Sequence, residues 1–119
     1  MHFFDTYALW EGFKKNPDYE QYFKGKLVCT IFNIYEFYWT LLKAFGKETA
    51  VKHTLALEDC AIEVSVQNIV DAFDLKKQLN TLDVSFIDCL GYVKAQEIGI
   101  RFLTGDKAFK DMENVEFVK

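Results

Sequence analysis

Four acidic residues are spaced along the chain so that an alternating α/β fold would bring them to one edge of its sheet. Asp5 and Asp106 each follow a short apolar run and are expected at the C-terminal ends of strands. Glu36 and Asp88 are expected in the first turns of helices. Sites in such folds form at these ends of strands and helices. Because no catalytic histidine or cysteine pattern lies beside them, converging carboxylates indicate a hard divalent cation, Mg²⁺ or Mn²⁺, bound by oxygen ligands.

The segments that must position these acids alternate between strand and helix patterns. Strands are predicted at residues 2–5, 27–31, 61–64, 101–104 and 115–118, and helices at about 6–14, 18–24, 34–45, 47–54, 66–79 and 86–98. Strands separated by helices form βαβ units with right-handed crossovers, which favour a mainly parallel sheet. We therefore expect an α/β fold: a single three-layer α/β/α domain over residues 1–119, in which helices flank a short, mainly parallel central sheet.

Two of the acids also have the spacing of helix caps. Asn33 with Glu36, and Ser85 with Asp88, match a capping box, in which the first side chain caps the helix and the second reaches back to the N-cap backbone. Capping therefore explains Glu36 and Asp88 without any site. A carboxylate in a first turn can also point into a pocket at the sheet edge, so both interpretations stay open.

The other two acids have local explanations as well. Asp5 could cap the helix that follows it, and Asp106 could be a turn residue. Electrostatics favours the shared site when the four are taken together. Two carboxylates ~6 Å apart at an effective dielectric constant of ~20 repel by roughly 3 kcal/mol. Four converging acids would therefore need a bound cation or raised pKa values.

Composition excludes disorder and limits nucleic-acid binding. Half of the 119 residues are hydrophobic and 17% are aromatic, so the chain can build a core. The formal net charge is −4 at pH 7, whereas nucleic-acid-binding proteins usually carry a basic surface. We expect any contact with RNA or DNA to be weak or bridged by metal ions. No GxGxxG or GxxxxGK loop occurs, which disfavours nucleotide cofactors.

The cysteine pattern favours a reducing compartment, and no segment predicts a membrane span or a secretory signal. Cys29, Cys60 and Cys89 are odd in number and widely spaced, with no CxxC pair, so free thiols are expected instead of disulfides or a zinc site. No apolar run approaches membrane-spanning length. The N-terminal segment contains Asp5 and Glu11 and lacks the basic start of a secretory signal. We expect a cytoplasmic protein without a membrane segment.

Aromatic residues are concentrated in the first part of the chain. Of the 20 Phe, Trp and Tyr residues, 14 precede residue 46, and the short early helices are too small to bury all of them. The candidates for an exposed partner interface are Trp10, Phe13, Tyr19, Tyr22 and Phe23. Exposed aromatic surface usually marks a protein interface. Ordinary core packing and a platform for base stacking are the alternatives.

Five short motifs, in their order and spacing, resemble the PIN domain and, within it, the small VapC-type toxin ribonucleases. They are Phe4-Asp5-Thr6, Tyr35-Glu36, Ser85-Phe86-Ile87-Asp88, residues 104–109 and residues 113–117. The resemblance implies that Asp5, Glu36, Asp88 and Asp106 are the catalytic, metal-binding acids. It also places Thr6 and Thr104 at the hydroxyl positions beside them. Tyr7 departs from the family pattern, which often has Asn at this position beside Asp5.

The resemblance also implies an activity and partners. The expected protein is an endoribonuclease that depends on Mg²⁺ or Mn²⁺, cleaves single-stranded RNA, and is the toxin of a type II toxin–antitoxin system. It would form a homodimer and offer its early helices to an antitoxin. Lys107 could contact a phosphate, although a solvated surface lysine is the simpler interpretation. The alternative is a non-catalytic α/β interaction module or a receiver-like signalling domain. A receiver should have an acidic neighbour beside Asp5 and its phospho-acceptor Asp at the end of a central strand, but no acid adjoins Asp5, and the second strand ends in Cys29-Thr30-Ile31 without an Asp.

Overall fold

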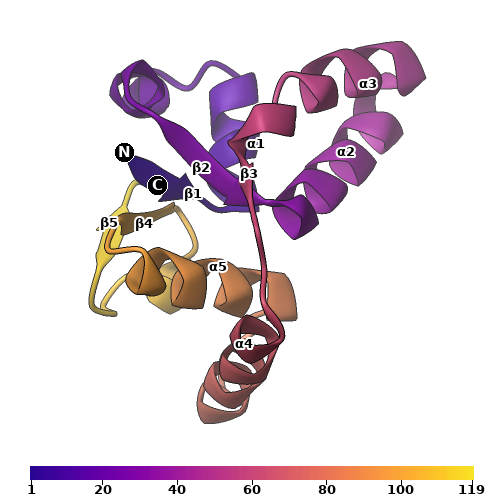
Figure 1. Ribbon diagram of the computed structural model, residues 1–119. Helices are drawn as coiled ribbons and strands as arrows, with labels where there is room; N and C mark the ends of the chain where they lie inside the picture. The colour runs from indigo at the N-terminus through magenta and orange to yellow at the C-terminus, as the bar shows by residue number, and fades with distance from the viewer.

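The computed structural model describes residues 1–119 and contains one parallel five-stranded sheet (Figure 1). The strands are β1 (His2–Phe4), β2 (Leu27–Thr30), β3 (Ala61–Ile62), β4 (Arg101–Thr104) and β5 (Val115–Phe117). They lie in the order β3-β2-β1-β4-β5, and every neighbouring pair is parallel. The predicted α/β fold with a parallel central sheet is confirmed.

Helices connect the strands, as the alternating pattern predicts. The α-helices are α1 (Thr6–Phe13), α2 (Ile31–Phe45), α3 (Lys47–Leu55), α4 (Val66–Gln78) and α5 (Phe86–Glu97), and the 3-10 helices are η1 (Pro17–Lys24), η2 (Glu58–Cys60) and η3 (Lys107–Phe109). The segment predicted as a helix at 18–24 is the 3-10 helix η1, which begins at Pro17 after the cap Asn16. No helix combines the length and the apolar character needed to cross a membrane.

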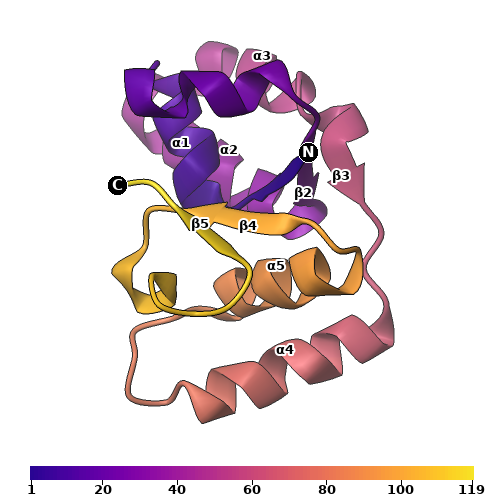
Figure 2. The ribbon, with the colours of Figure 1, turned by 90° about the vertical axis from the view of Figure 1, so that its left-hand side faces the viewer.

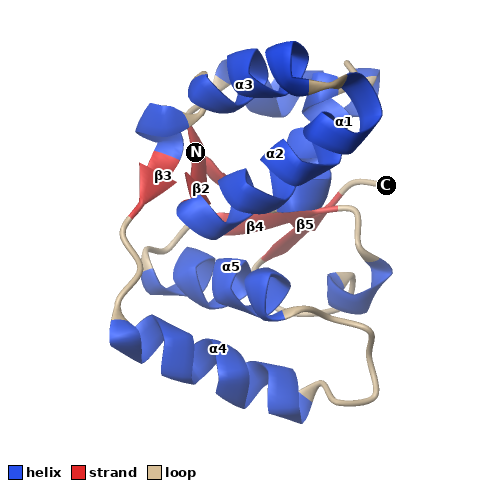
Figure 3. Cartoon of the chain, turned by 90° about the vertical axis from the view of Figure 1, so that its right-hand side faces the viewer, coloured by secondary structure: helices blue, strands red, loops and turns tan.

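The sheet separates two layers of helices (Figure 2 and Figure 3). α1, α2 and α3 cover one face, α5 covers the other, and α4 packs on the outside of α5. Phe3 and Phe102 belong to the core on the α5 side, while Phe4 and Leu103 belong to the core under α1 and α2. Successive side chains of a strand point to opposite faces, so these short apolar strands are buried on both sides.

α2 begins three residues earlier than the apolar spacing predicts. Its N-cap is Thr30, the last residue of β2, and Asn33 is the third residue of the helix. The Thr30 hydroxyl accepts from the backbone N–H of Asn33, while the Asn33 side chain accepts from the backbone N–H of Thr30. This capping box replaces the one predicted between Asn33 and Glu36. Glu36 therefore lies in the second turn of α2, and the capping explanation for it was wrong.

The sheet order creates one favoured position for a site. From β1 the chain adds β2 and β3 on one side and then returns to place β4 and β5 on the other. The strand order therefore reverses between β1 and β4, and crevices form at the C-terminal ends of strands at such a point. Asp5 directly follows β1, and Asp106 lies two residues after β4.

Candidate active site

Asp5 is the buried centre of the acidic edge. It is the N-cap of α1, its side chain is 2% exposed, and its Oδ1 accepts from the backbone N–H of Ala8 at 2.8 Å. The Thr104 hydroxyl donates to Asp5 Oδ2. The capping explanation for Asp5 is therefore correct, but it uses only one carboxylate oxygen. The second oxygen is held by the neighbouring strand, which a cap does not require.

The environment of Asp5 disfavours its charge. Burial raises the pKa of Asp5 to about 8, although hydrogen bonds from Thr104 and Ala8 oppose this shift. The charges of Asp88 and Asp106 raise the pKa of Asp5 further. A carboxyl group with this pKa is mostly protonated at pH 7. The structure thus brings three acids that are far apart in sequence within electrostatic range of one another.

Glu36 joins the same edge through the residue that follows Asp5. The Thr6 hydroxyl donates to Glu36 Oε1 at 2.6 Å, and the Asn33 side-chain amide donates to Thr6 Oγ1 at 3.2 Å. Burial raises the pKa of Glu36, the hydrogen bond from Thr6 opposes that shift, and the charge of Asp88 adds to it. Thr6 therefore fixes Glu36 next to the end of β1.

Asp88 is both a helix cap and a member of the acidic group. Its Oδ2 accepts from the backbone N–H of Ser85 at 3.0 Å, and the Ser85 hydroxyl accepts from the backbone N–H of Asp88 at 3.1 Å. The predicted capping box at the start of α5 is confirmed. Burial raises the pKa of Asp88 against these hydrogen bonds, and the charges of Asp106 and Asp83 raise it further. Asp88 therefore caps α5 and still interacts electrostatically with the other acids.

Asp106 is tied to Asp5 through one hydroxyl group. The Thr104 hydroxyl, which donates to Asp5, also accepts from the backbone N–H of Asp106 at 3.0 Å. Asp106 caps η3, because its Oδ1 accepts from the backbone N–H of Ala108 at 2.9 Å. Thr104 is fully buried. The two threonines predicted beside the acids therefore orient them: Thr6 binds Glu36, and Thr104 links Asp5 to Asp106.

The donor chemistry fits a hard divalent cation, although the side chains are not gathered around one point. No three Asp, Glu, His or Cys side chains lie close enough together to hold one ion in their present positions. Glu36, Asp88 and Asp106 each accept a hydrogen bond at one carboxylate oxygen, and no hydrogen bond reaches the other. Mg²⁺ and Mn²⁺ prefer such oxygens. We expect a bound cation to draw these free oxygens toward Asp5.

The sequence did not reveal the polar support behind these acids. Asn33 is 1% exposed and contacts both Thr30 and Thr6, so it connects the end of β2 to the residue that holds Glu36. The available signal was the pair Thr30 and Asn33 itself, because Thr followed three residues later by a polar side chain has cap spacing. The apolar spacing favours a helix start at Ile34, which hides the cap spacing of Thr30 and Asn33.

Tyr7, the departure from the family pattern, packs against the turn that carries Asp106. A Cβ added to Gly105 would lie 2.2 Å from Cε1 of Tyr7 and 2.7 Å from the carbonyl oxygen of Val118. Glycine is therefore required between Thr104 and Asp106 because the Tyr7 ring and the C-terminal segment occupy the space of any side chain. Tyr7 leaves the hydrogen bonds of Asp5 intact.

The aromatic residues predicted as a partner interface divide into two groups. Tyr19 is fully buried, and its hydroxyl donates to the carbonyl oxygen of Val118, so its prediction as an exposed contact was wrong. η1 folds back over the start of the sheet and carries Tyr19 into the core. Trp10, Phe13 and Tyr22 are partly buried against that core, and Phe23 is 41% exposed.

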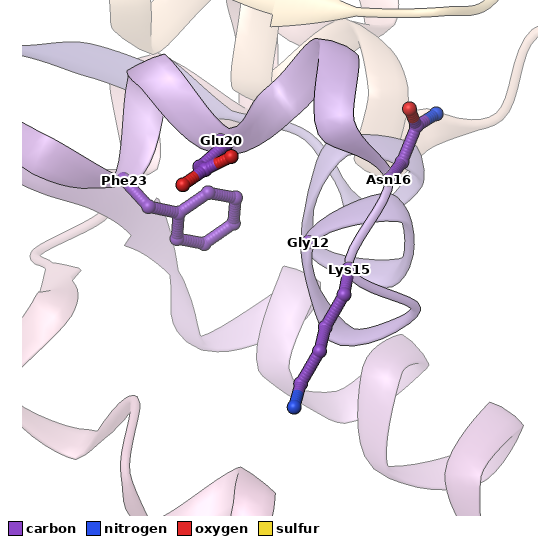
Figure 4. A pocket seen from close by; sticks show the side chains of 5 residues that line it. All are labelled: Gly12, Lys15, Asn16, Glu20 and Phe23. Carbon is purple, nitrogen blue, oxygen red and sulfur yellow. The ribbon is translucent and has the colours of Figure 1, made fainter.

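Two cavities lie beside these aromatic residues, and neither borders the acids. Figure 4 shows a cavity of about 370 Å³ lined by Gly12, Lys15, Asn16, Glu20 and Phe23. An adjoining cavity of about 190 Å³ is more apolar and shares Gly12 and Phe23 with it. The Phe23 ring lies directly over Gly12, because an added Cβ there would be 1.9 Å from Phe23 Cζ. The hollow surface and the acidic edge are therefore separate features.

Comparisons with known proteins agree with this architecture. A family model described as the PIN domain matches residues 3–115. The solved structure of VapC20 from Mycobacterium tuberculosis, described as a toxin that cleaves the sarcin–ricin loop, aligns over 100% of both chains with a TM-score of 0.79 and 17% identity. A toxin–antitoxin complex from Klebsiella pneumoniae aligns over 98% of this chain and 96% of that one, with a TM-score of 0.77 and 17% identity. No curated protein sequence matches the chain.

Proposed function

The chain belongs to the PIN domain family, and we propose that it is a divalent-metal-dependent endoribonuclease that hydrolyses phosphodiester bonds of single-stranded RNA. The placement of the acids carries this proposal: hydrogen bonds of Thr6 and Thr104 hold Glu36, Asp5 and Asp106 at the C-terminal ends of β1 and β4, and the charges of Asp88 and Asp106 add to the burial that raises the pKa of Asp5. None of the four forms an ion pair with a basic side chain. Acids held together without a positive partner favour binding of a cation.

The residues of the edge have distinct proposed roles. Asp5, Glu36, Asp88 and Asp106 would hold Mg²⁺ or Mn²⁺ with carboxylate oxygens. A divalent ion at such a site lowers the pKa of a bound water and stabilises charge on a phosphate. The hydroxyls of Thr6 and Thr104 keep Glu36 and Asp5 in position.

We also propose that the protein is the toxin of a type II toxin–antitoxin pair and acts in the cytoplasm. Two solved structures with this fold are described as a toxin and as a toxin–antitoxin complex, which supports the proposal. The antitoxin would bind the surface of α1, η1, α2 and α3. There Phe13 stacks on Trp10 at 5.6 Å and contacts Phe45 at 5.3 Å, and Phe45 is 54% exposed. Aromatic side chains in such positions commonly anchor protein interfaces.

A homodimer would use α4 together with the first part of α2, whereas Phe45 of the antitoxin surface is the last residue of α2. Each helix exposes an apolar stripe at helical spacing: Ile31, Tyr35 and Trp39 on α2, and Val66, Val70 and Phe73 on α4. Tyr35, Trp39 and Phe73 are between one half and two thirds exposed, and aromatic side chains present about 150–250 Å² each, so these three offer on the order of 350 Å² per copy toward the roughly 800 Å² per partner of a standard interface. Packing of α2 on α4 of a second copy in a two-fold arrangement would cover both stripes.

Cleavage of labelled single-stranded RNA tests the nuclease proposal. The wild type should cut the RNA with Mn²⁺ and lose this activity in EDTA. Asp5→Asn and Asp106→Asn should each abolish cleavage without unfolding the protein, whereas Asp59→Asn in the exposed part of η2 should cut normally. Retained cleavage in both site variants would remove the proposal. Absence of cleavage in the wild type across unrelated RNAs would favour the alternative, a non-catalytic interaction or receiver-like module.

A further inference from the structure

Three lysines gather at the end of the sheet beside Asp106, and they form a basic cluster in an acidic chain. Lys107 follows Asp106 directly, and Lys110 lies at the end of η3. β4 and β5 pair in parallel, and the backbone N–H of Val118 donates to the carbonyl oxygen of Thr104 at 2.9 Å. The segments that leave these two strands therefore lie side by side. This register brings Lys119 next to Lys107.

The side chains of Lys107 and Lys110 lie within electrostatic range of Lys119, and none of the three lysines forms an ion pair. The side chains of Lys107 and Lys110 lower the pKa of Lys119, and the Nζ of Lys110 lies 5.5 Å from the centre of the Phe117 ring on β5. All three lysines are exposed. None forms an ion pair, because the ion pairs of the protein involve Lys14, Lys94 and Arg101. Like charges that gather without forming ion pairs favour binding of an anion.

We propose that Lys107, Lys110 and Lys119 bind the phosphates of an RNA strand next to the one that is cut. This inference rests on the proposed nuclease function and specifies its substrate contact. The cluster begins one residue from Asp106, so a strand held by it continues directly onto the acidic edge. Lysine contacts to phosphate fix the position of a strand without reading its sequence. The protein therefore binds the phosphate backbone of the RNA on the β5 side of the site, although its net charge is −4.

Salt dependence of RNA binding tests the lysine cluster separately from catalysis. The site variant is K107Q/K110Q/K119Q, and the matched control is K24Q/K26Q/K47Q, which removes three exposed, unpaired lysines elsewhere. Lys24 and Lys26 precede the N-terminal end of β2, whereas Lys107, Lys110 and Lys119 follow the C-terminal ends of β4 and β5. Both variants change the net charge equally. Binding of a labelled oligouridylate is followed by fluorescence anisotropy between 50 and 200 mM salt, in EDTA to prevent cleavage.

The expected result is a smaller salt dependence in the site variant alone. Each phosphate contact to a single strand contributes about 0.7 to the slope of log K against log salt, so three lost contacts lower the slope by about 2. The wild type should then lose roughly 20-fold more affinity than the site variant between the two salt concentrations. An equal change in the control, an unchanged slope in the site variant, or no binding by the wild type would overturn the proposal. Because binding is measured without catalysis, a protein that binds through the cluster but never cuts RNA would contradict only the nuclease function.

Discussion

Replacing Asp5 by Asn should stabilise the metal-free protein at neutral and alkaline pH. The amide has the same shape, can accept from the backbone N–H of Ala8 as the acid does, and carries no charge. The pKa of Asp5 rises from an ordinary value of 3.8 to about 8 in the fold. The folded chain therefore keeps a proton at Asp5 that the unfolded chain loses. The free energy of unfolding of the wild type falls as pH rises between these two values.

The size of the effect follows from the pKa shift. Each pKa unit corresponds to about 1.4 kcal/mol, so the advantage of Asp5→Asn over the wild type should grow by about 3–4 kcal/mol between pH 5 and pH 8. Below pH 3.8 the acid is protonated in both states, and its contribution to pH dependence disappears. Glu36 and Asp88 also titrate, but both proteins retain them.

Urea unfolding in EDTA at pH 5, 6.5 and 8, followed by tryptophan fluorescence, measures this difference. Asp59→Asn, in the exposed part of η2, is the control and should show a constant difference from wild type. Adding Mn²⁺ at pH 8 should reverse the order, because the metal stabilises only the state that binds it. A difference that stays constant from pH 5 to pH 8 would refute the assignment of Asp5 as a buried acid repelled by its neighbours.

Four other predictions follow from the same structure. Asp88→Asn keeps the capping box of α5, since the two other capping boxes carry Asn at this position. The melting temperature of this variant in EDTA should rise, and its increase on adding Mn²⁺ should be smaller than that of the wild type. A lower melting temperature in EDTA would show that Asp88 acts only as a helix cap. Thr6→Ala loses the hydrogen bond to Glu36 and should cut RNA about 10-fold more slowly while losing about 1 kcal/mol of stability in urea unfolding. Tyr19→Phe should cost about 1 kcal/mol of folding stability in the same assay, without changing binding of an antitoxin. Phe73→Asp should shift the protein from dimer to monomer in sedimentation equilibrium, and an unchanged mass would exclude α4 from the interface.

The strands could be predicted because each is a short apolar run bounded by turn or cap residues. Phe3-Phe4 and Phe102-Leu103 must be buried on both faces, which is typical of strands in a parallel sheet covered by helices. The parallel direction of the strands and the shared edge then followed from the alternation of strands and helices, whereas the order of the strands was not predicted. The placement of Asp5 and Asp106 at the ends of β1 and β4 is confirmed for this reason.

Helix starts and side-chain burial were harder to predict, because tertiary contacts decide them. Thr30 and Asn33 have equivalent cap chemistry, and the helix begins at the first because β2 ends there. Tyr19 is a residue type that is common in protein interfaces, yet its hydroxyl donates a hydrogen bond to the carbonyl oxygen of Val118, 99 positions away. The bond from Thr6 to Glu36 spans 30 positions. No local pattern reveals such pairings, so the acids could be found from sequence while their supporting hydrogen bonds could not.

A crystal structure of the protein with Mn²⁺, with anomalous scattering recorded at the manganese absorption edge, tests the central claim most directly. The claim is that Asp5, Glu36, Asp88 and Asp106 form one divalent-cation site. The account predicts an anomalous peak between these carboxylates, with the free oxygens of Asp88 and Asp106 turned toward it. A peak elsewhere, or none at this edge of the sheet under conditions in which Mn²⁺ supports cleavage, would contradict it.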